Sequence, residues 1–198
     1  MPRPEVFVSI DIESDGPAPG LNSMLALGAV AFLQDETELR SWYATLLALP
    51  DAQENPETMA WWQTQEGAWV EVNTGQVQPE YALPDFAAWC TDLPGKPVAV
   101  AWPAAFDFAF VNYYLHRFCG MNPLGFGALD IRSYANDLAR HPGYYGISEA
   151  SVRGLAGEID KHGLRPHVAV DDAREQGRLF MALRRAAMRA ATGPGREA

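Results

Sequence analysis

EVFVSIDI, at residues 5–12, is the clearest strand pattern in the sequence, and the turn-rich segment SDGPAPG follows it at 14–20. Apolar and polar residues alternate along 5–12 and several are β-branched, which indicates a strand, while the glycines and prolines of 14–20 indicate a loop. Asp11 and Glu13 lie two residues apart, so a strand directs both carboxylates to the same face. Taken alone, such a pair more often solvates a loop than binds a cation.

The segments that follow predict a mixed α/β sheet. MLALGAVAFL at 24–33 and ELRSWYATLL at 38–47 are separated by QDET, which favours an antiparallel meander. In chain order, the remaining patterns predict helices that begin at Pro56 and within 83–93, a strand at 97–102, a helix at 106–118, a short strand at 128–131 leading into a helix, and a long helix at 170–191. Three strands followed by alternating strands and helices favour a mixed sheet over a sandwich or a helix bundle.

The composition is that of a globular protein. Apolar residues make up 48% and charged residues 20% of the 198 residues, which suits one domain with a core. We predict a single domain at 1–192 and a frayed tail at 193–198. No apolar run approaches the roughly 18 residues that cross a bilayer, and no signal-peptide pattern is present, so a cytoplasmic protein without membrane contact is expected. Cys90 and Cys119 lack CxxC spacing and are predicted to be small buried side chains rather than a disulfide or zinc site.

The net charge of −10 argues at first against a nucleic-acid partner, because phosphate binding usually relies on a basic surface. The charge is unevenly distributed, however. Residues 1–99 hold three basic and fifteen acidic side chains, whereas residues 100–198 hold twelve basic and ten acidic ones. Divalent ions bound to some of the acids would cancel part of the negative charge. Nucleic acid is therefore not excluded.

Two further acidic segments carry the functional hypothesis. Asp107 follows the strand at 97–102 and opens the next helix, where an ordinary first-turn acid is the alternative interpretation. Asp172 begins the last helix five residues after His167, and Asp171 is an N-cap candidate for that helix. Each position is unspecific alone, and the hypothesis rests on the set.

VSIDIESDG (8–16), VAWPAAFDFAFV (100–111) and HVAVDDA (167–173) resemble the three exonuclease motifs of the DEDD superfamily, in the branch that has histidine in the third motif, DEDDh. They occur in the family's order over most of the chain. Two other stretches, NPETMAWWQTQ (55–65) and LDIRSYANDL (129–138), are more weakly similar to relatives of phage exodeoxyribonuclease A and to polyadenylate-preferring bacterial exoribonucleases. The resemblance implies a ribonuclease-H-like mixed sheet flanked by helices, two Mg²⁺ or Mn²⁺ ions, and release of nucleoside monophosphates from 3′ ends of single-stranded RNA or DNA.

Carried over by position, the resemblance assigns a role to each motif residue. Asp11, Glu13 and Asp172 would hold one metal, with Asp11 bridging to a second that Asp107 supports directly or through water. His167 would be the general base that takes a proton from the attacking water, and histidine suits this role near neutral pH. Carboxylate oxygens suit magnesium or manganese better than zinc, and two ions about 4 Å apart serve phosphodiester attack.

The chain departs from the family at two places. Trp102 and Pro103 stand where ribonuclease T and its relatives have His-Asn, and Ala26 stands where many members have a glutamate. These changes affect substrate identity more than metal chemistry. The candidates for substrate contact are Met24, Leu25, Trp102, Phe106 and Arg132. For Met24 and Leu25, core packing is an equally good explanation. Arg132 follows the predicted strand at 128–131 and could reach a phosphate.

Aromatic and basic side chains elsewhere have alternative interpretations. Trp61, Trp62 and Trp69 could stack on bases, but tryptophans at helical spacing more often belong to a core or interface. Four arginines form one stripe within a sector of about 60° on the last helix. We predict a solvated face for them rather than an RNA track or subunit contact. They are Arg174, Arg178, Arg185 and Arg189.

The leading hypothesis is a 3′-to-5′ exonuclease, with RNA modestly favoured over DNA. The alternative is a catalytically silent nucleic-acid or protein-binding domain that keeps the fold, although such a module has no need for converging like charges. A homodimer is expected by analogy with small relatives.

Overall fold

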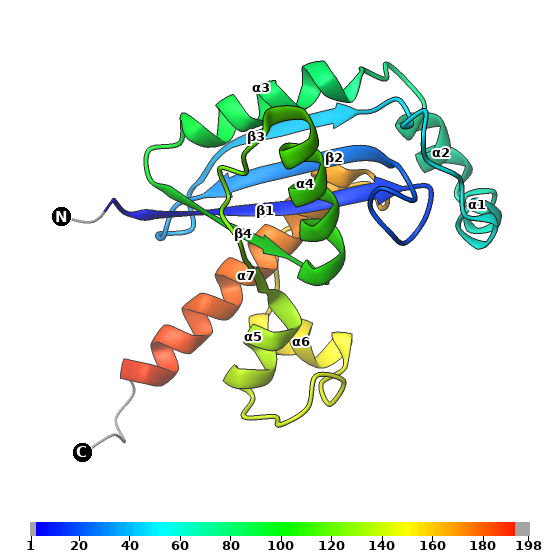
Figure 1. The fold of residues 1–198 in the computed structure, drawn as a ribbon. Helices are drawn as coiled ribbons and strands as arrows, with labels where there is room; N and C mark the ends of the chain where they lie inside the picture. The colour runs from blue at the N-terminus through cyan, green and yellow to red at the C-terminus, as the bar shows by residue number, and fades with distance from the viewer. Residues whose placement is uncertain (1–2, 193–198) are drawn as a thin grey trace.

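A five-stranded mixed sheet forms the centre of the protein, as a computed structural model that describes residues 3–192 shows (Figure 1). The predicted tail at 193–198 lies outside the described residues. The strand order is β3-β2-β1-β4-β5; β2 is antiparallel to both β1 and β3, while β4 is parallel to both β1 and β5. The predicted meander of the first three strands is therefore confirmed. The strands are β1 (Glu5–Ser14), β2 (Met24–Phe32), β3 (Glu38–Thr45), β4 (Lys96–Ala101) and β5 (Ala128–Asp130).

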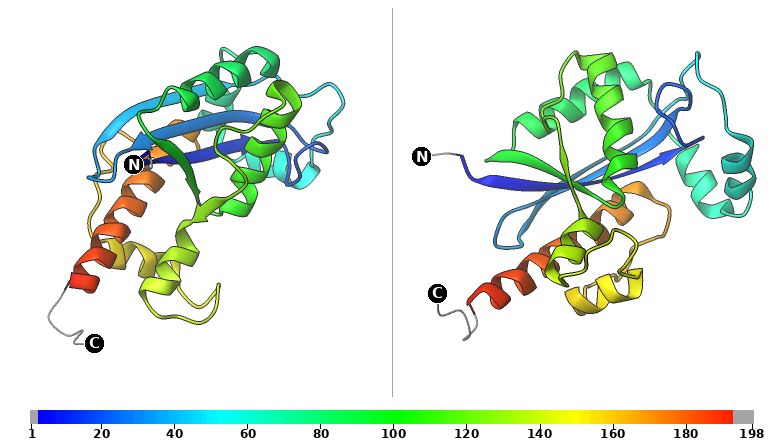
Figure 2. Two further views of the ribbon diagram at one scale, coloured as in Figure 1. Left: turned by 60° about the vertical axis from the view of Figure 1, so that its left-hand side comes forward. Right: turned by 60° about the horizontal axis from the view of Figure 1, so that its bottom comes forward.

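Helices cover both faces of the sheet (Figures 1 and 2). One core cluster joins the sheet to α3 and α4, a second joins the opposite face to α5, α6 and α7, and a third lies at the end of the sheet beside α1 and α2. The helices within residues 3–192 are α1 (Pro56–Trp62), α2 (Glu66–Val72), α3 (Pro79–Thr91), α4 (Ala104–Cys119), α5 (Ile131–Leu138), α6 (Glu149–Ala156) and α7 (Ala169–Thr192).

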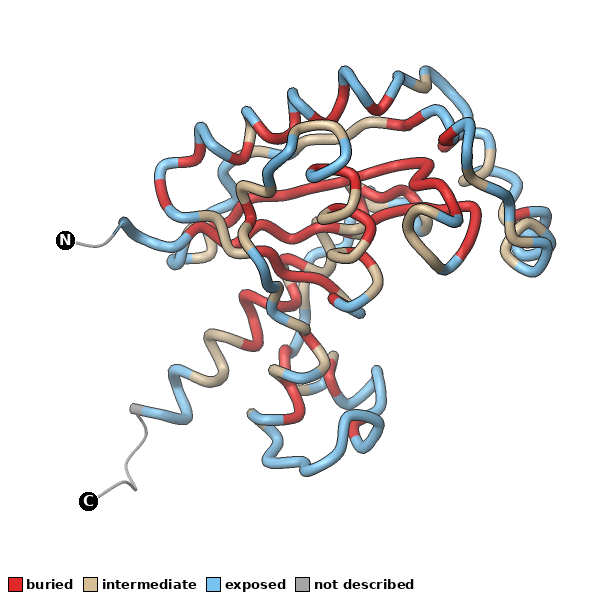
Figure 3. Tube along the Cα trace, in the orientation of Figure 1, coloured by how far each residue is buried: buried red, intermediate tan, exposed pale blue. Residues whose placement is uncertain are grey.

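The alternation along β1 decides which face carries the acidic pair. Val8 and Ile10 belong to the core under α3 and α4, whereas Phe7 packs against Phe180 of α7 with ring centroids 5.3 Å apart. Side chains of odd number therefore point toward α7. Asp11 and Glu13 continue this series at the end of a strand that is buried along most of its length (Figure 3).

Two glycines allow α7 to approach the sheet closely. A Cβ at Gly28 of β2 would lie 2.2 Å from the backbone of Ala169 and Val170, and a Cβ at Gly177 of α7 would lie 2.2 Å from the ring of Phe32. Gly28 is the register partner of Asp11 in the β1–β2 ladder. The first turn of α7 is thus placed directly beside the end of β1.

Several predicted helix boundaries were wrong. The helix in 83–93 begins five residues before Pro84, because Pro79 takes the first helical position and the carbonyl of Gln78 accepts hydrogen bonds from the next turn. In α7 the carbonyl of Val168 accepts from the amides of both Asp171 and Asp172. Asp171 therefore lies in the first turn and is not the N-cap. The sequence patterns did not indicate α2 and α6.

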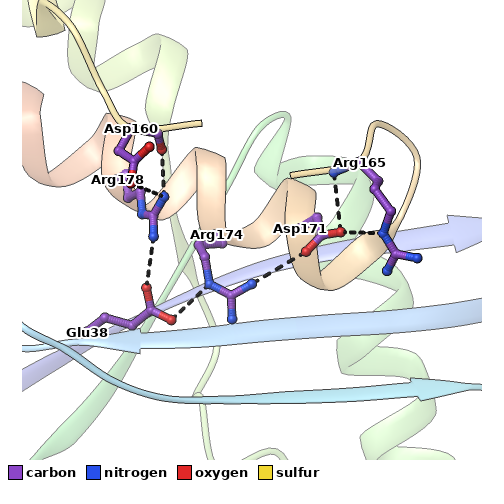
Figure 4. A network of polar contacts seen from close by, with 6 residues as sticks. All are labelled: Glu38, Asp160, Arg165, Asp171, Arg174 and Arg178. Atoms are coloured by element: carbon purple, nitrogen blue, oxygen red, sulfur yellow. Dashed lines mark hydrogen bonds and ion pairs between the residues drawn. The ribbon is translucent and has the colours of Figure 1, made fainter. Parts of the chain in front are cut away.

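The arginine stripe of α7 is not the solvated face that was predicted. Arg174 pairs with Glu38 of β3 at 2.9 Å, and Arg178 binds the same carboxylate at 3.6 Å and the carbonyl of Asp160 at 2.6 Å (Figure 4). Arg185 pairs with Glu36 of the β2–β3 turn. Three of the four arginines therefore tie α7 to its neighbours, because the helix lies across the sheet and brings them within reach of these acids.

Both cysteines are free, as predicted; Cys90 is buried, whereas Cys119 is only partly buried, so the prediction of burial was wrong for Cys119. None of the helices within residues 3–192 has the length and apolarity needed to cross a membrane.

Candidate metal centre

Four carboxylates from three elements converge at one end of the sheet. Asp11 and Glu13 end β1, Asp107 lies in the first turn of α4, and Asp172 lies in the first turn of α7. Burial raises the pKa of Asp11 well above its ordinary range, and the charges of Asp107, Glu13 and Asp172 raise it further. Burial, followed by repulsion from Asp172 and Asp107, raises the pKa of Glu13 to about 8. Burial raises the pKa of Asp107 to about 7. Burial raises the pKa of Asp172, and the neighbouring His167 offsets part of that rise.

No arginine or lysine compensates these four charges, since within residues 3–192 none of them forms an ion pair with either residue type. Their hydrogen bonds position them instead. Gln176 donates to Asp11 Oδ1 at 2.6 Å, and the amide of Ile12 donates to Asp107 Oδ1 at 3.2 Å. Buried carboxylates that repel one another destabilise the folded state unless a positive charge occupies the site.

A subset of these groups is arranged for a cation. Ligand atoms of Glu13, His167 and Asp172 all lie within 4.8 Å of one another. The carboxylate oxygens of Glu13 and Asp172 suit a divalent ion such as Mg²⁺ or Mn²⁺, and the imidazole of His167 lies beside them. The converging acids, which have no arginine or lysine partner among the described residues, fit a metal centre.

The backbone of His167 is held in an unusual conformation. Its φ of 59° lies in the left-handed region, which non-glycine residues seldom adopt. Its amide donates to Asp172 Oδ2 at 2.8 Å, which stabilises this turn. The imidazole meets the ring of Trp61 from α1 edge-on, with centroids 4.9 Å apart. Asp172 therefore both faces the other acids and fixes the histidine beside them.

A cleft of about 360 Å³ opens in front of the acids. Asp11, His167 and Asp172 line this cleft together with Arg132 and Arg153. The two arginines differ in their contacts. Arg153 pairs with Glu149 and Glu175, so its charge is compensated within the protein.

The sequence of the chain matches that of a described family along most of its length. The sequence model of the family described as "3'-5' exoribonuclease Rv2179c-like domain" matches residues 6–183. The chain belongs to this family. A relative, the 3'-5' DNA exonuclease Cap18 of Escherichia coli, is 31% identical over 187 residues, which cover 89% of this chain and 90% of that protein. The enzyme class predicted from the three motifs, a 3′-to-5′ exonuclease, is confirmed at the level of the family.

Solved structures show the same fold for this exonuclease domain. The nuclease domain of 3'hExo, a DEDDh family member bound to rAMP, superposes with a TM-score of 0.67 at 11% identity and covers 91% of this chain and 92% of its own. Escherichia coli Exonuclease I in complex with a dA16 oligonucleotide gives a TM-score of 0.62 at 12% identity, and this chain spans 41% of its length. The predicted ribonuclease-H-like fold is confirmed.

Only some of the residues predicted to contact substrate lie at the cleft. Met24 is 0% exposed and Leu25 is 5% exposed, and each belongs to a core cluster. Their burial supports the packing alternative for both residues. Phe106 is partly buried against Phe110, with ring centroids 5.2 Å apart. Trp102 and Arg132 are the two candidates that line the cleft.

The three tryptophans of α1 and α2 also differ in their burial and contacts. Trp62 is buried and donates its Nε1 hydrogen to the carbonyl of Ser14 at 2.9 Å, and Trp69 packs against it. Trp61 is 40% exposed and contacts His167. The expected core role therefore describes Trp62 and Trp69, while Trp61 belongs to the surroundings of the site.

Gln176 was missed by the sequence interpretation. It follows Asp172 by four residues, so both side chains lie on the same face of α7. That spacing was the available signal. Its Oε1 is buried without a hydrogen-bond partner among the described residues, while its Nε2 group holds Asp11.

Proposed function

We propose that this chain removes nucleoside monophosphates one at a time from the 3′ ends of single-stranded RNA or DNA, with two divalent ions, Mg²⁺ or Mn²⁺, held by Asp11, Glu13, Asp107 and Asp172. The convergence of these four carboxylates beside His167, without an arginine or lysine partner among the described residues, is the observation that carries the proposal. A binding module that lacks catalysis gains nothing from such a cluster, which disfavours the silent-domain alternative.

The residues divide the work. Asp11 is the proposed bridging ligand, and Gln176 fixes its carboxylate. Asp172 is a ligand that also anchors the backbone of His167. His167 would accept the proton of the attacking water. Bound divalent ions supply activation of that water and relief of negative charge on the phosphate oxygens.

Relatives support both the polarity and the substrate class. The family is described by 3'-5' exoribonuclease activity, whereas Cap18 is named a 3'-5' DNA exonuclease. The 3'hExo domain was solved with rAMP, Exonuclease I with dA16, and Pop2p of S. pombe with Mg²⁺ and Mn²⁺. RNA and DNA substrates can both present a single-stranded 3′ end. The proposal therefore specifies a single strand and leaves the choice between ribose and deoxyribose open.

A degradation panel tests the proposal. Single-stranded and duplex RNA and DNA, labelled at the 5′ end and carrying free or blocked 3′ ends, should be incubated with Mg²⁺, Mn²⁺ or excess EDTA. Stepwise shortening of free single strands, abolished by EDTA or by a 3′ block, is expected. A first product from an internal cut, or full activity in EDTA, would contradict the proposal.

Two further predictions belong with this function. A homodimer is expected by analogy with small relatives, and light scattering of the purified chain measures it. A cytoplasmic location also stays a prediction, which fractionation of cells that produce the protein tests.

A further inference from the structure

Arg132 is the cation of the cleft whose charge is not compensated by an ion pair. Within residues 3–192 no carboxylate pairs with it, and its buried Nε has no hydrogen-bond partner. Arg153, which lines the same cleft, is by contrast bound to Glu149 and Glu175. An unpaired guanidinium in a cleft that Asp11 and Asp172 also line is suited to an anion that enters this cleft.

Aromatic rings hold Arg132 on two sides. Its Cζ lies 5.6 Å from the ring centroid of Trp102 and 5.6 Å from that of Tyr144. Tyr144 in turn meets Tyr145 edge-on, with centroids 5.0 Å apart. Trp102 and Arg132 line the cleft with Asp11 and His167, and Arg132 connects this lining to the two tyrosines.

The loop between α5 and α6 that carries the two tyrosines is held in place. Asn136 of α5 is 7% exposed and donates from Nδ2 to the carbonyl of Tyr144 at 3.1 Å. The amide of His141 donates to the carbonyl of Asn136 at 2.8 Å. Tyr145 nevertheless keeps 86% of its surface exposed. A large ring that is presented to solvent on an anchored loop beside the cleft is available to a ligand.

We propose that Trp102, Arg132, Tyr144 and Tyr145 form a track for the nucleotides upstream of the 3′-terminal one, with Arg132 on a phosphate and the two tyrosines on bases. This inference rests on the proposed function. Stacking requires unpaired bases and tolerates any sequence, because every base has a π face. The track therefore selects single strands several nucleotides long over paired ends, and it does so without reading sequence.

The binding test separates base contacts from phosphate contacts. Binding of a fluorescein-labelled single strand of about twelve nucleotides, with a phosphorothioate last linkage, is followed by fluorescence anisotropy in Mg²⁺. A second strand of equal length has abasic sites in place of the upstream bases. Tyr145→Ala should raise the Kd for the first strand about ten-fold and change the Kd for the abasic strand much less.

Two matched variants complete the design. Tyr145→Phe should keep the wild-type Kd, since the ring and not the hydroxyl does the stacking. Tyr81→Ala removes a tyrosine that is 68% exposed on α3, across the sheet from the cleft, and should leave both Kd values unchanged. Arg132→Gln should weaken the binding of both strands. It should also reduce the magnitude of the slope of log binding constant against log salt concentration by about 0.7, the value for one phosphate contact on a single strand.

Equal losses on the normal and abasic strands for Tyr145→Ala, or no loss on either, would overturn the base-stacking track. An unchanged salt slope for Arg132→Gln would remove the phosphate contact. Binding and degradation are measured separately, so the two failures are distinguishable. Shortening of strands by wild-type protein with binding indifferent to Tyr145 refutes the track alone. Binding that depends on Tyr145, with no shortening of any strand, refutes the proposed function alone.

Discussion

The two sides of α7 carry charge in opposite ways. On the side that faces the end of β1, Asp172 joins three other acids, and no arginine or lysine of residues 3–192 pairs with them. On the side that faces β3, Arg174 and Arg178 share Glu38, and Arg174 also lies 3.5 Å from Asp171 (Figure 4). One helix thus carries a set of unpaired like charges and a set of compensated opposite charges.

The difference shows how to tell a functional charge cluster from a structural one. Ion pairs that are partly open to solvent are worth little, but they cost little, and a fold can use them to attach a helix. Buried carboxylates that repel one another oppose folding, and their raised pKa values express that cost. Such an arrangement indicates a ligand of positive charge, which is why the metal is proposed on this side of α7.

The largest effect is expected from Asp11→Asn. Loss of the proposed bridging ligand should remove several kcal/mol of transition-state stabilisation, which corresponds to a fall in kcat on the order of 10³. The same change should stabilise the metal-free protein, because it removes one of four repelling charges. Single-turnover degradation and thermal unfolding in EDTA measure the two effects. If Asp11→Asn keeps wild-type turnover, the acids on this side of α7 are not a functional cluster, and the contrast with the ion pairs on the other side fails.

His167→Ala should lower kcat by a factor on the order of 10² while metal binding is nearly kept, because the side chain removed is the proposed base rather than a principal ligand. The acidic limb of the pH–rate profile should flatten as well. His162→Ala, which removes an exposed histidine in the α6–α7 connection, is the matched control. If His167→Ala keeps wild-type turnover and pH dependence, the acidic side of α7 contains ligands without this base.

The metal-free protein should become less stable as pH rises from about 5 to 8. The pKa of Glu13 is raised from 4.5 to about 8 and that of Asp107 from 3.8 to about 7, so in this window the folded state binds more protons than the unfolded state. The free energy of unfolding then falls with rising pH, and the stability that the protonated forms of these two groups contribute is lost above about pH 8. Calorimetry in EDTA should show a falling Tm, Mg²⁺ should raise Tm most at high pH, and Asp11→Asn should flatten the trend. A Tm that is constant or rises across this range would mean that the acids are not jointly buried.

The smallest effect is expected from Glu38→Gln, which is the same acid-to-amide change on the compensated side. It should destabilise the protein by about 1 kcal/mol, since Arg174 and Arg178 lose a partly buried partner. Turnover should stay within about two-fold of wild type. Urea unfolding and the degradation assay measure both. A large loss of turnover would show that the network positions Asp172 and is not only an attachment of the helix.

The acids could be predicted partly from local rules and partly from the resemblance to the exonuclease motifs. A strand with a period of two places Asp11 and Glu13 on one face, and the motif order around Asp107, His167 and Asp172 implied the rest by resemblance. The structure brings the four carboxylates together and gathers Glu13, His167 and Asp172 within 4.8 Å. The roles assigned to them stay predictions.

What could not be predicted depends on the partner that packs against each element. Helical periodicity placed Arg174 and Arg178 on one face, but it cannot show that Glu38, far away in the sequence, faces them. The depth of Met24 is likewise set by α3 and α4 rather than by its own strand. Tyr144 lies in an irregular loop, and its contact with Arg132 has no signature in spacing.

The close approach of α7 to Gly28 has a consequence for heritable variation. Any missense change at this codon adds a Cβ that would lie 2.2 Å from the backbone between Ala169 and Val170, and a backbone cannot yield as the tip of a side chain can. The start of α7 would have to move, carrying Asp172 and His167 away from Asp11. A genetic screen for inactive alleles should therefore recover position 28 together with the acids themselves, although Gly28 has no side chain that could bind a metal or a substrate.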